Sequence, residues 1–515
     1  MGPDMKNRVL ILDFGSQYTK LIARRIRETG VYSEIFPFNA PIDKILDFSP
    51  GALVLSGGPS SVYASRAPRI SPEILAMGIP VLGICYGMQL LAHLSGMRVT
   101  PAKEREYGLA QLNVSGKSRL LQGIPSPTPV WMSHGDKITQ LPPDFSITAR
   151  TENTEMAVIE SDSRGLYGVQ FHPEVIHTSE GRRILENFLF NISGLSADWN
   201  MGDFVSEAVT RIRSEVKDRR ILLGLSGGVD STVLAMLLQN AIGERLIPVF
   251  VDTGLLRKNE FQDLMRRFKE RLGLNVHGID ASDLFLERLR RVRSPERKRK
   301  IIGRTFIDVF ADVEKKVGRV EFFAQGTLYP DVIESVSVNG PAAKIKSHHN
   351  VGGLPETLNW RLIEPFRELF KDEVRLIGRE LGLDDTWIQR HPFPGPGLAV
   401  RIIGAVTRER VQRLQEADAI LIEELHRRGI YDDIWQAFTV LLPIRSVGVM
   451  GDVRTYENVA VLRMVRSVDG MTADSYPADH EFLSGTANRI VNEVKGINRV
   501  AYDLTSKPPG TIEWE

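Results

Sequence analysis

Short apolar runs alternate with amphipathic stretches through the first part of the chain. Four such runs, each bounded by glycine or polar residues, lie at 8–15, 51–59, 78–87 and 165–174, and the first is followed by an amphipathic stretch at 18–30. Continuous apolar runs are typical of strands buried on both faces, and their alternation with helices predicts a parallel, doubly wound sheet. In such sheets ligands bind at the carboxyl ends of the strands, which is where the glycine-rich endings of these runs lie.

A second pattern of the same kind begins near residue 201. The apolar run at 220–225 enters a glycine turn, an apolar helix is predicted over 231–243, and a second strand and helix follow at 245–254 and 258–273. A further strand at 319–324 leads into a polar loop. These alternations predict a second doubly wound α/β sheet.

The pattern changes after the segment HPFPGPG at 391–397. A helical run at 408–429 precedes two strand-like stretches at 437–452 and 457–465, and the last segment, 499–515, is expected to end in a short strand. The predicted fold class is therefore α/β, with two doubly wound domains followed by a smaller α+β domain. The predicted domain bounds are 7–196, 197–390 and 391–515.

The composition narrows the function classes only a little. The 515 residues are 42% hydrophobic and 25% charged, and 65 Lys and Arg against 64 Asp and Glu give a net charge of +1. This balance provides no global field for nucleic acid, and no apolar run reaches the roughly 20 residues of a membrane span. A single cysteine excludes an internal disulfide and favours a reducing compartment, so we expect a cytoplasmic protein.

That single cysteine stands in a sequence pattern typical of nucleophiles. Cys85 lies between Gly83 and Gly87, after an apolar run and before an amphipathic one, which predicts a sharp strand-to-helix turn that exposes the side chain. The positive end of the helix dipole there favours a thiolate. His172 and Glu174, two residues apart at a strand end, point to the same side if extended, as a base and its orienting group would.

Two other interpretations of these residues are weighed. A buried cysteine is usually inert packing, but the turn and the H-x-E pair favour catalysis. His172 and His177 as metal ligands lack a third ligand or a cysteine pair. Backbone amides of the turn at 56–59 and of Tyr86 are candidates to bind an oxyanion in acyl transfer.

Several motifs of the first 190 residues together resemble the class I glutamine amidotransferases. They are LDFGSQY, LSGGPSS, GICYGMQL, SHGD and VQFHPE, spread over residues 9–191. The resemblance implies that Cys85 forms a glutamyl thioester, with His172 as base and Glu174 orienting it. It further implies an oxyanion- and glutamine-binding set that contains Gly57, Gly58, Tyr86 and Gln89. The ammonia released would be used elsewhere in the chain.

The glycine turn LSGGVDS at 225–231 is a candidate phosphate site. Backbone amides at a helix start, with the hydroxyls of Ser226 and Ser231, form a cradle suited to pyrophosphate. The turn at 224–228 also fits the serine-hydrolase form G-x-S-x-G, but that interpretation leaves VDS unexplained. The stretch SGKS at 115–118 imitates the end of a P-loop, yet Gln111 stands where its first glycine belongs.

This turn resembles the PP-loop of the N-type ATP pyrophosphatases, which split ATP into AMP and pyrophosphate. The resemblance continues through VFVDTGLLR and AQGTLYPDVIES. It implies Mg²⁺ with ATP, held by Asp230 and Asp331, because carboxylates and water suit that cation. The implied ATP-binding residues are Leu225, Ser226, Gly227, Gly228, Val229, Asp230, Ser231, Val251 and Gly326, of which Val251 and Gly326 would lie near the adenosine.

The densest basic run, at 290–304, has three interpretations. Such runs usually form a solvated helix face, and nucleic-acid binding is a second option. A third is a mobile lid that closes over the triphosphate and excludes water. Next to a PP-loop, the lid is the interpretation we favour.

Proline- and glycine-rich loops with cations fill the C-terminal region, and each alone is a weak signal. Together with the terminal KPPGTIEWE, they make the whole chain similar to the glutamine-hydrolysing GMP synthetase family. The resemblance implies adenylation of XMP by ATP and amination of the adenylate to GMP. It also implies a homodimer formed through the C-terminal domain. The implied XMP-binding residues are Lys346, His348, Arg367, Lys371, Arg445, Lys507, Ile512 and Glu513.

Features of the sequence distinguish this chain from three other classes of protein. NAD and asparagine synthetases pair a PP-loop with other glutaminases or lack the HPFPGPG and KPPGTIEWE segments. PP-loop enzymes that modify RNA typically need cysteines beside the loop, and none stands there. An inactive regulatory relative of the glutaminases would not be expected to keep Cys85, His172 and Glu174.

Overall fold

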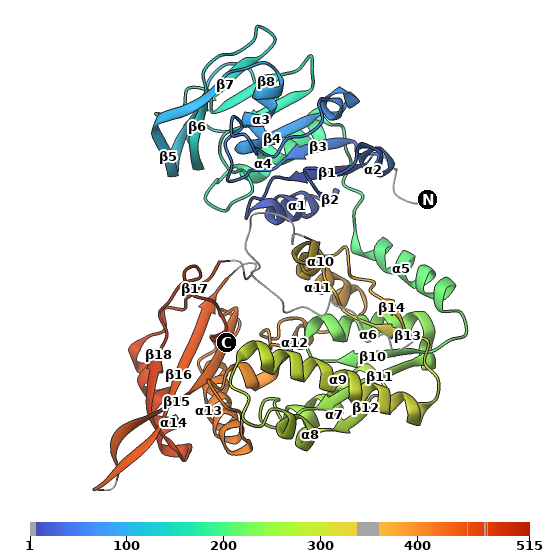
Figure 1. Cartoon of the computed structure of the whole chain (residues 1–515), viewed down its shortest axis with the longest axis vertical. Coiled ribbons are helices and arrows are strands. Elements are labelled where there is room, and N and C mark those ends of the chain that lie inside the picture. Colours follow the sequence, from blue (N-terminus) through green and yellow to red (C-terminus); the bar gives the residue numbers. More distant parts are fainter. Residues whose placement is uncertain (1–6, 337–359, 451, 468–469, 471) are drawn as a thin grey trace. The chain divides into compact units, whose positions relative to one another are not determined.

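The computed structural model describes residues 7–336, 360–450, 452–467, 470 and 472–515 (Figure 1). These residues form two compact units, the first ending at about Asp203 and the second starting at Phe204. The second unit contains two sheets, one on each side of the boundary predicted at residue 390. The three predicted domain bounds stay predictions.

The first unit is built on one mixed sheet. Its strand order is β2-β1-β3-β4-β9-β8-β7-β5-β6, parallel from β2 to β9 and antiparallel from there on. The strands are β1 (Arg8–Asp13), β2 (Tyr32–Pro37), β3 (Ala52–Leu55), β4 (Val81–Ile84), β5 (Val99–Val114), β6 (Thr128–Ile138), β7 (Ser146–Arg150), β8 (Val158–Ser161) and β9 (Leu166–Val169). The helices are α1 (Thr19–Glu28), α2 (Ile42–Phe48), α3 (Tyr86–Leu94) and α4 (Gly181–Glu186). The four apolar runs are strands, as predicted, and the antiparallel extension was not foreseen.

The second sheet is entirely parallel, with the order β12-β11-β10-β13-β14. Its strands are β10 (Ile221–Leu225), β11 (Leu246–Asp252), β12 (His277–Asp280), β13 (Phe322–Ala324) and β14 (Arg361–Ile363). The helices around it are α5 (Met201–Val216), α6 (Val229–Ile242), α7 (Glu260–Leu272), α8 (Ser282–Arg288), α9 (Pro295–Val317), α10 (Tyr329–Val336), α11 (Lys371–Glu380) and α12 (Asp385–Ile388).

Helices cover both faces of this second sheet. Phe250 of β11 contacts Phe261 and Phe268 of α7 on one face. Phe323 of β13 contacts Phe310 of α9, which also lies against the backbone of β10. Because neighbouring side chains of a strand point to opposite faces, Val249 and Val251 pack with the α9 side while Phe250 packs with α7. The predicted doubly wound arrangement is confirmed here.

A four-stranded sheet forms the rest of the second unit. Its elements are α13 (Arg408–Arg427), β15 (Gln436–Met450), β16 (Val453–Arg466), β17 (Asp474–Ser475), α14 (His480–Glu493) and β18 (Ile497–Tyr502). The long antiparallel pair of β15 and β16 corresponds to the two predicted stretches. One apolar core runs from Leu222 of β10 through Leu398 to Leu462 of β16, so the two sheets share a hydrophobic interior.

The expected short strand at the end of the chain is wrong. The strand of this segment is β18, at its beginning, and residues 503–515 contain only a single bridge, between Lys507 and Ala473. Two prolines at 508–509 lack the N–H groups that a ladder needs. Among the described helices, none has the length and apolarity needed to cross a membrane.

Candidate active sites

Cys85 occupies a strained turn between β4 and α3. Its φ of 52° and ψ of −106° lie in a region that residues with a side chain rarely adopt. A Cβ on Gly83 would lie 2.6 Å from the carbonyl oxygen of Gly87, and a Cβ on Gly87 would lie 2.1 Å from that of Leu55. Only glycine fits at both positions, so the predicted strand-to-helix turn is confirmed.

His172 and Glu174 form a buried pair beside the cysteine. The Nδ1 of His172 lies 2.7 Å from Oε1 of Glu174, and both side chains are almost fully buried. The Sγ of Cys85 donates to the carbonyl of Ser133 (3.5 Å), and Cys85 acts electrostatically on His172. Burial acts to lower the pKa of His172, but the charge of Glu174 and the bonds to Cys85 and Glu174 raise it to about 11. The imidazole is therefore protonated at neutral pH.

The backbone around His172 is fixed on both sides. Its N–H donates to the carbonyl of Trp131 (3.0 Å), and its own carbonyl accepts from Oγ1 of Thr178 (2.6 Å). The ring of Tyr18 packs edge-on against the imidazole, with the ring centres 5.0 Å apart. The base therefore approaches the cysteine in one orientation, as general-base catalysis requires.

The predicted oxyanion residues differ in their surroundings. A Cβ on Gly57 would lie 3.2 Å from Cε1 of His172, so the backbone of this turn runs beside the imidazole. Tyr86 is the first residue of α3, and its N–H has no acceptor within the helix. Gly58 faces the carbonyl of Phe14, which a Cβ would approach to 2.7 Å.

Gln89 lies one helical turn after the cysteine and is buried. Its amide nitrogen donates to Oε1 of Gln170 (3.2 Å) and to the carbonyl of Asp136 (3.3 Å). The carboxylate of Asp136 accepts from the hydroxyl of Tyr63 (2.8 Å). Gln89 therefore ties α3 to β6 and to the end of β9, the elements that carry the cysteine and the histidine.

His134 of β6, Glu106 of β5 and Thr154 form a buried polar cluster that the sequence analysis did not single out. The Nδ1 of His134 lies 2.8 Å from the carbonyl of Asp136, and its Nε2 lies 3.2 Å from Oγ1 of Thr154. That hydroxyl donates to Glu106 (2.6 Å). Burial lowers the pKa of His134, against the charge of Glu106. The motif SHGD, which contains His134 and Asp136, is the part of the sequence that indicates this cluster.

A second candidate site lies at the carboxyl end of β10. Gly227 has a φ of 73°, Gly228 precedes the first residue of α6, and the hydroxyls of Ser226 and Ser231 are 3.0 Å apart. The N–H of Gly228 lies 3.3 Å from Oγ of Ser226. The loop thus wraps amides and hydroxyls around one spot at a helix start, which is the arrangement predicted for an anion cradle.

Asp230 is the acidic residue of this loop. Its Oδ1 is buried without a hydrogen-bond partner among the described residues, and its Oδ2 lies 3.9 Å from Nζ of Lys371. Burial raises the pKa of Asp230, Lys371 and Arg375 act to lower it, and the neighbouring Asp331 raises it. The two carboxylates predicted to hold a metal therefore sense each other's charge. No cluster of three potential metal ligands occurs among the described residues.

The remaining ATP-binding candidates divide into two groups. Gly326 lies beside Asp230, since a Cβ there would be 3.7 Å from the Cβ of Asp230. Leu225 and Val251 are buried in their strands, so the backbone is what they can offer a ligand.

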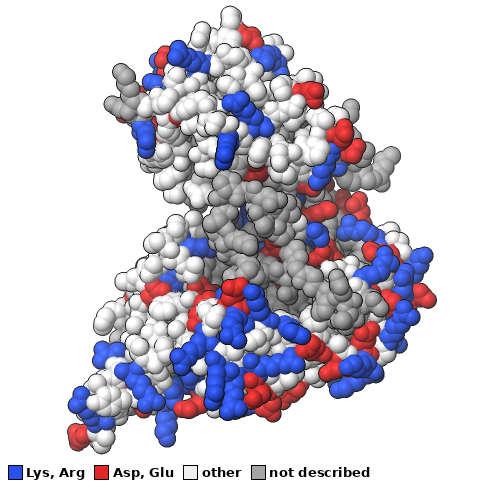
Figure 2. Space-filling model, in the orientation of Figure 1, with Lys and Arg blue, Asp and Glu red and all other residues white. Residues whose placement is uncertain are grey.

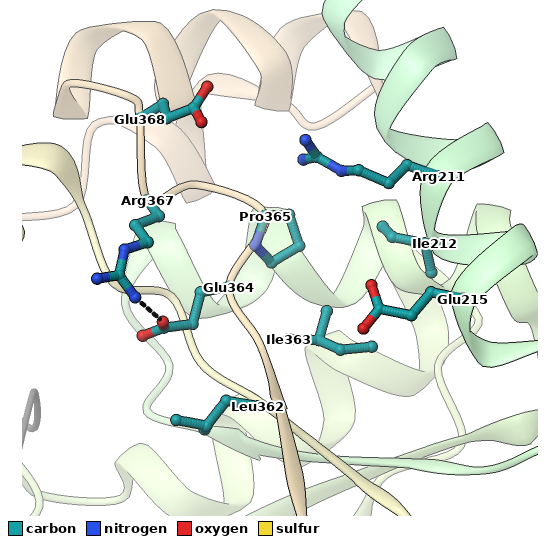
Figure 3. Close-up of a pocket in the computed structure, with 9 residues that line it drawn as sticks. All are labelled: Arg211, Ile212, Glu215, Leu362, Ile363, Glu364, Pro365, Arg367 and Glu368. Atoms are coloured by element: carbon teal, nitrogen blue, oxygen red, sulfur yellow. Dashed lines mark hydrogen bonds and ion pairs between the residues drawn. The ribbon is translucent and has the colours of Figure 1, made fainter. Parts of the chain in front are cut away.

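Arg367 lies near a shallow hollow of about 160 Å³ rather than in the loop (Figure 3). Its guanidinium turns toward Glu364, with Nη1 2.8 Å from Oε2, and Glu364 also accepts from Thr327. Arg211 and Glu215 of α5 face the same hollow in Figure 3. None of the residues that line it belongs to the phosphate loop.

The end of the chain is held by buried cations. Glu513 accepts from Nη2 (2.9 Å) and Nε (3.2 Å) of Arg401, a fully buried residue, and from Nε2 of Gln436 (2.7 Å). Nη1 of Arg401 has no partner among the described residues. Ile512 is buried in a small cluster with Phe438 of β15. Gln436 and Arg401 are neighbours of this site that the sequence did not single out.

Lys507 also lies in this region. Nζ of Lys507 donates to the carbonyl of Gly470 (2.7 Å), and its backbone pairs with Ala473. Arg445 is exposed on β15, nine residues beyond Gln436 and past an irregularity in the pairing with β16. Lys346 and His348 lie outside the described residues.

The interpretation of 290–304 as a mobile lid is wrong for the described helix. The run includes the first turns of α9, and Figure 2 shows Lys and Arg gathered on that part of the surface. Lys298 in the same run is fully buried, and its Nζ donates to the carbonyls of Ala399 (2.9 Å) and Ile402 (2.7 Å) and to the carboxylate of Glu515. A helix anchored in this way is a packed element with a solvated outer face.

Three family models match consecutive parts of the chain. Glutamine amidotransferase class-I matches residues 10–192, NAD synthase matches 201–298 and GMP synthase C terminal domain matches 423–514. The first covers the cysteine site, the second covers the phosphate loop, and the third covers the terminal segment. The NAD synthase match ends before the C-terminal region, where the third model applies.

Full-length relatives carry one name. The chain is 54% identical to the GMP synthase [glutamine-hydrolyzing] of Brachyspira hyodysenteriae, over 99% of both chains. It is 56% identical to the protein of that name from Chlorobium chlorochromatii and to the one from Thermosipho melanesiensis, in each case over 98% of this chain and 99% of the relative. The similarity thus extends across both sites and the terminal segment.

Proposed function

The chain belongs to the family of glutamine-hydrolysing GMP synthases, and we propose how its residues divide the work of that reaction. XMP, ATP, glutamine and water are converted to GMP, AMP, pyrophosphate and glutamate by this ligase, with glutamine as the nitrogen donor. The observation that carries the assignment is the identity of 54–56% over nearly the whole chain. The buried Cys85–His172–Glu174 group supports it, because glutamine hydrolysis needs such a group.

Glutamine hydrolysis takes place at Cys85 in this proposal. The thiolate attacks the carboxamide carbon of glutamine, and the C–N bond breaks as His172 gives its proton to the departing ammonia. A water molecule then attacks the thioester, with His172 taking its proton, and glutamate leaves. Glu174 holds the imidazole in one orientation throughout and favours its protonated form before each proton transfer to a leaving group, through the 2.7 Å contact.

Backbone amides stabilise the oxyanion of both tetrahedral intermediates. Tyr86 supplies an N–H that the helix leaves without an acceptor, and the turn with Gly57 and Gly58 supplies the others. Gln89, together with Asp136 and Gln170, helps to hold the substrate glutamine. Its support is the pair of hydrogen bonds that tie it to both.

ATP binds at the phosphate loop between β10 and α6. The amides of residues 227–231 and the hydroxyls of Ser226 and Ser231 surround its polyphosphate, and Lys371 faces it from the start of α11. The oxygen on C2 of XMP attacks the α-phosphorus, and pyrophosphate leaves. Ammonia then adds to C2 and AMP departs, which leaves GMP.

Asp230 and Asp331 would hold the Mg²⁺ that accompanies ATP. The fit rests on the unpartnered, buried Oδ1 of Asp230 and on the second carboxylate within its electrostatic reach. Two carboxylates with phosphate oxygens and water suit this cation. When bound, the cation would supply positive charge beside the leaving pyrophosphate.

XMP binds against the terminal segment. Lys507 supplies a cation for the 5′-phosphate, and Ile512 and Glu513 line the site, supported by their attachment to the buried part of the C-terminal sheet. Lys371 serves the adenylate from its position beside Asp230, and Arg367 stays a candidate from the resemblance. Arg445, Lys346 and His348 stay candidates from the resemblance.

The chain works as a cytoplasmic homodimer in this proposal. The pair β15 and β16 carries five exposed apolar side chains, 45–74% accessible: Ile444, Val447, Val449, Val453 and Tyr456. A long hairpin with such a surface is a candidate for association with a second copy. The single cysteine fits a reducing compartment.

Product analysis tests the function directly. Purified chain given XMP, ATP, Mg²⁺ and glutamine is expected to form GMP, AMP, pyrophosphate and glutamate in equal amounts. Replacing XMP by nicotinic acid adenine dinucleotide or aspartate is expected to yield no aminated product. AMP release with either replacement and none with XMP would overturn the assignment.

A further inference from the structure

The phosphate loop has a weak point at one peptide bond. Gly227 adopts a φ of 73°, and glycine passes between positive and negative φ at little cost. In a planar trans peptide the carbonyl of Gly227 and the N–H of Gly228 point in opposite directions. A flip of this peptide would turn an N–H away from the loop interior and aim a carbonyl oxygen at the phosphates instead. The loop therefore needs a group that fixes this carbonyl from behind.

Arg390 is in the position to do so. Its Nη1 donates to the carbonyl of Gly227 (2.6 Å), while the N–H of Gly228 faces Oγ of Ser226 on the other side (3.3 Å). The two residues that Arg390 joins are 163 positions apart in sequence. Arginine forms such directed bonds through a rigid, planar donor set.

The guanidinium is itself held by a buried carboxylate. Nη2 of Arg390 donates to Oε1 of Glu260 (2.5 Å), and Glu260 is only 7% exposed. The second oxygen of Glu260 accepts from the backbone N–H of Arg257 (2.9 Å), which fixes the carboxylate at the start of α7. One face of Gly227 is also closed, because a Cβ there would lie 2.4 Å from Leu264 of the same helix.

The next residue fixes the backbone of Arg390. His391 stacks on Tyr431, with ring centres 3.8 Å apart and planes within 4°, and its Nε2 lies 2.9 Å from the carbonyl of Tyr431. The N–H of Ala437 donates to Nδ1 of His391 (3.3 Å). Arg390 is thus anchored on the C-terminal sheet while its side chain contacts the phosphate loop.

We propose that Arg390, held by Glu260, is a positioning residue that keeps the Gly227–Gly228 peptide oriented to receive the polyphosphate of ATP. This inference rests on the proposed function of the loop. Arg390 contacts neither substrate nor metal in this proposal, and it affects only ligands whose phosphates reach the loop. We therefore expect that removing the Arg390 guanidinium causes a selective loss of triphosphate binding rather than a general loss of nucleotide binding.

Binding of two nucleotides to the full chain tests this selectivity. The probes are Mg²⁺ with α,β-methylene-ATP, which cannot be cleaved at the α–β bond, and AMP, both measured by titration calorimetry. In Arg390→Met the dissociation constant of the triphosphate is expected to rise tenfold or more, while that of AMP changes less than twofold. Arg390→Lys, which keeps one donor, is expected to fall between the wild type and Arg390→Met.

Two further variants serve as partner and control. Glu260→Gln is expected to weaken triphosphate binding in the same selective way, and its combination with Arg390→Met to add little further loss. Arg266→Met removes an exposed arginine from the same helix as Glu260 and is expected to match the wild type. Kinetics of the ammonia-driven reaction should show the KM for ATP rising in Arg390→Met.

The failure of the inference and that of the function give different results. Equal losses for AMP and for the triphosphate, or no loss in Arg390→Met, would overturn the positioning role while the loop remains an ATP site. If the wild type itself binds no Mg²⁺ and α,β-methylene-ATP, the proposed function of the loop fails, and the inference fails with it.

Discussion

Lys298 and Glu515, 217 positions apart, form an ion pair in which the lysine is fully buried. The same Nζ donates to the carbonyls of Ala399 and Ile402. One side chain thus joins α9, the segment after HPFPGPG and the end of the terminal segment. Burial lowers the pKa of Lys298, while Glu515 acts to raise it, so the carboxylate is what keeps the buried amine charged.

Replacing this lysine by methionine leaves a carboxylate in the interior without its partner. Breaking a buried pair in this way costs about 3–5 kcal/mol, so Lys298→Met is expected to lower the melting temperature of the second unit. Because the same pair holds the terminal segment, the KM for XMP is expected to rise more than the KM for ATP. Lys300→Met, an exposed neighbour, is the control. A melting curve like that of the wild type would show that the pair contributes nothing.

The His172–Glu174 pair predicts a pH dependence. The carboxylate and Cys85 raise the pKa of His172 to about 11, so in the wild type the imidazolium persists across the neutral and mildly alkaline range. In Glu174→Gln the pKa falls toward the ordinary 6.5, and the imidazolium is lost as pH rises above that value. Glutamate release by the variant is therefore expected to decline from pH 7 to 9, where the wild type stays level.

The control for this profile is Glu152→Gln, an exposed change in the same unit. It is expected to follow the wild type at every pH. A Glu174→Gln profile parallel to that of the wild type, lower only by a constant factor, would contradict the role of the carboxylate in holding the proton.

Cys85→Ala separates the two chemistries. Removal of the nucleophile is expected to reduce glutamine-driven GMP formation by about a thousandfold or more. Synthesis from added ammonium should stay near the wild-type rate, because the phosphate loop and the terminal segment are untouched. The measurement is GMP formed with each nitrogen source, and equal losses with both would count against a separate glutaminase.

The hydrophobic pattern predicted the parallel strands because they are buried on both faces. β1, β3 and β4 are almost continuously apolar, and their burial gives a signal that needs no partner to interpret. β6 alternates buried and half-exposed positions, but His134 and Asp136 stand at buried positions and interrupt its apolar pattern. That strand and its antiparallel neighbours were missed for this reason.

The candidate sites also differ in whether neighbouring residues in the sequence mark them. The turn at Cys85 is determined by two glycines beside it in the sequence, Gly83 and Gly87, at which no other residue fits. The partners of Lys298, Arg390 and Arg401 lie 217, 163 and 112 residues away, and nothing near these cations in the sequence marks them as buried. Lys298 was consequently placed with the rest of the run 290–304 in a mobile lid, the interpretation that its burial contradicts.

Asp230→Asn is expected to trade activity for stability. Burial raises the pKa of Asp230, which means that folding disfavours its charged form at neutral pH. The neutral amide should therefore raise the melting temperature of the ligand-free protein at pH 7 by a few degrees and leave it unchanged at a pH low enough to protonate the carboxylate. AMP formation should be lost with glutamine and with ammonium alike.

Asp312→Asn is the control for stability, with no rise in melting temperature expected. A hydrogen bond from Lys315 lowers the pKa of Asp312, so its charged form is favoured on the surface, and the amide is expected to bring no gain. If Asp230→Asn formed AMP at the wild-type rate, the metal-binding role of this carboxylate would be refuted.

The exposed hairpin tests the homodimer. Val449 is 74% accessible and Val453 is 64% accessible, so each apolar side chain is left in water unless a second copy covers it. Val449→Asp with Val453→Asp places charges on that surface without disturbing the interior, and it is expected to weaken association at least a hundredfold. Light scattering should give twice 57.7 kDa for the wild type and 57.7 kDa for the variant. Leu46→Asp, an equally polar change on α2, should remain a dimer, and a dimeric hairpin variant would exclude this surface as the interface.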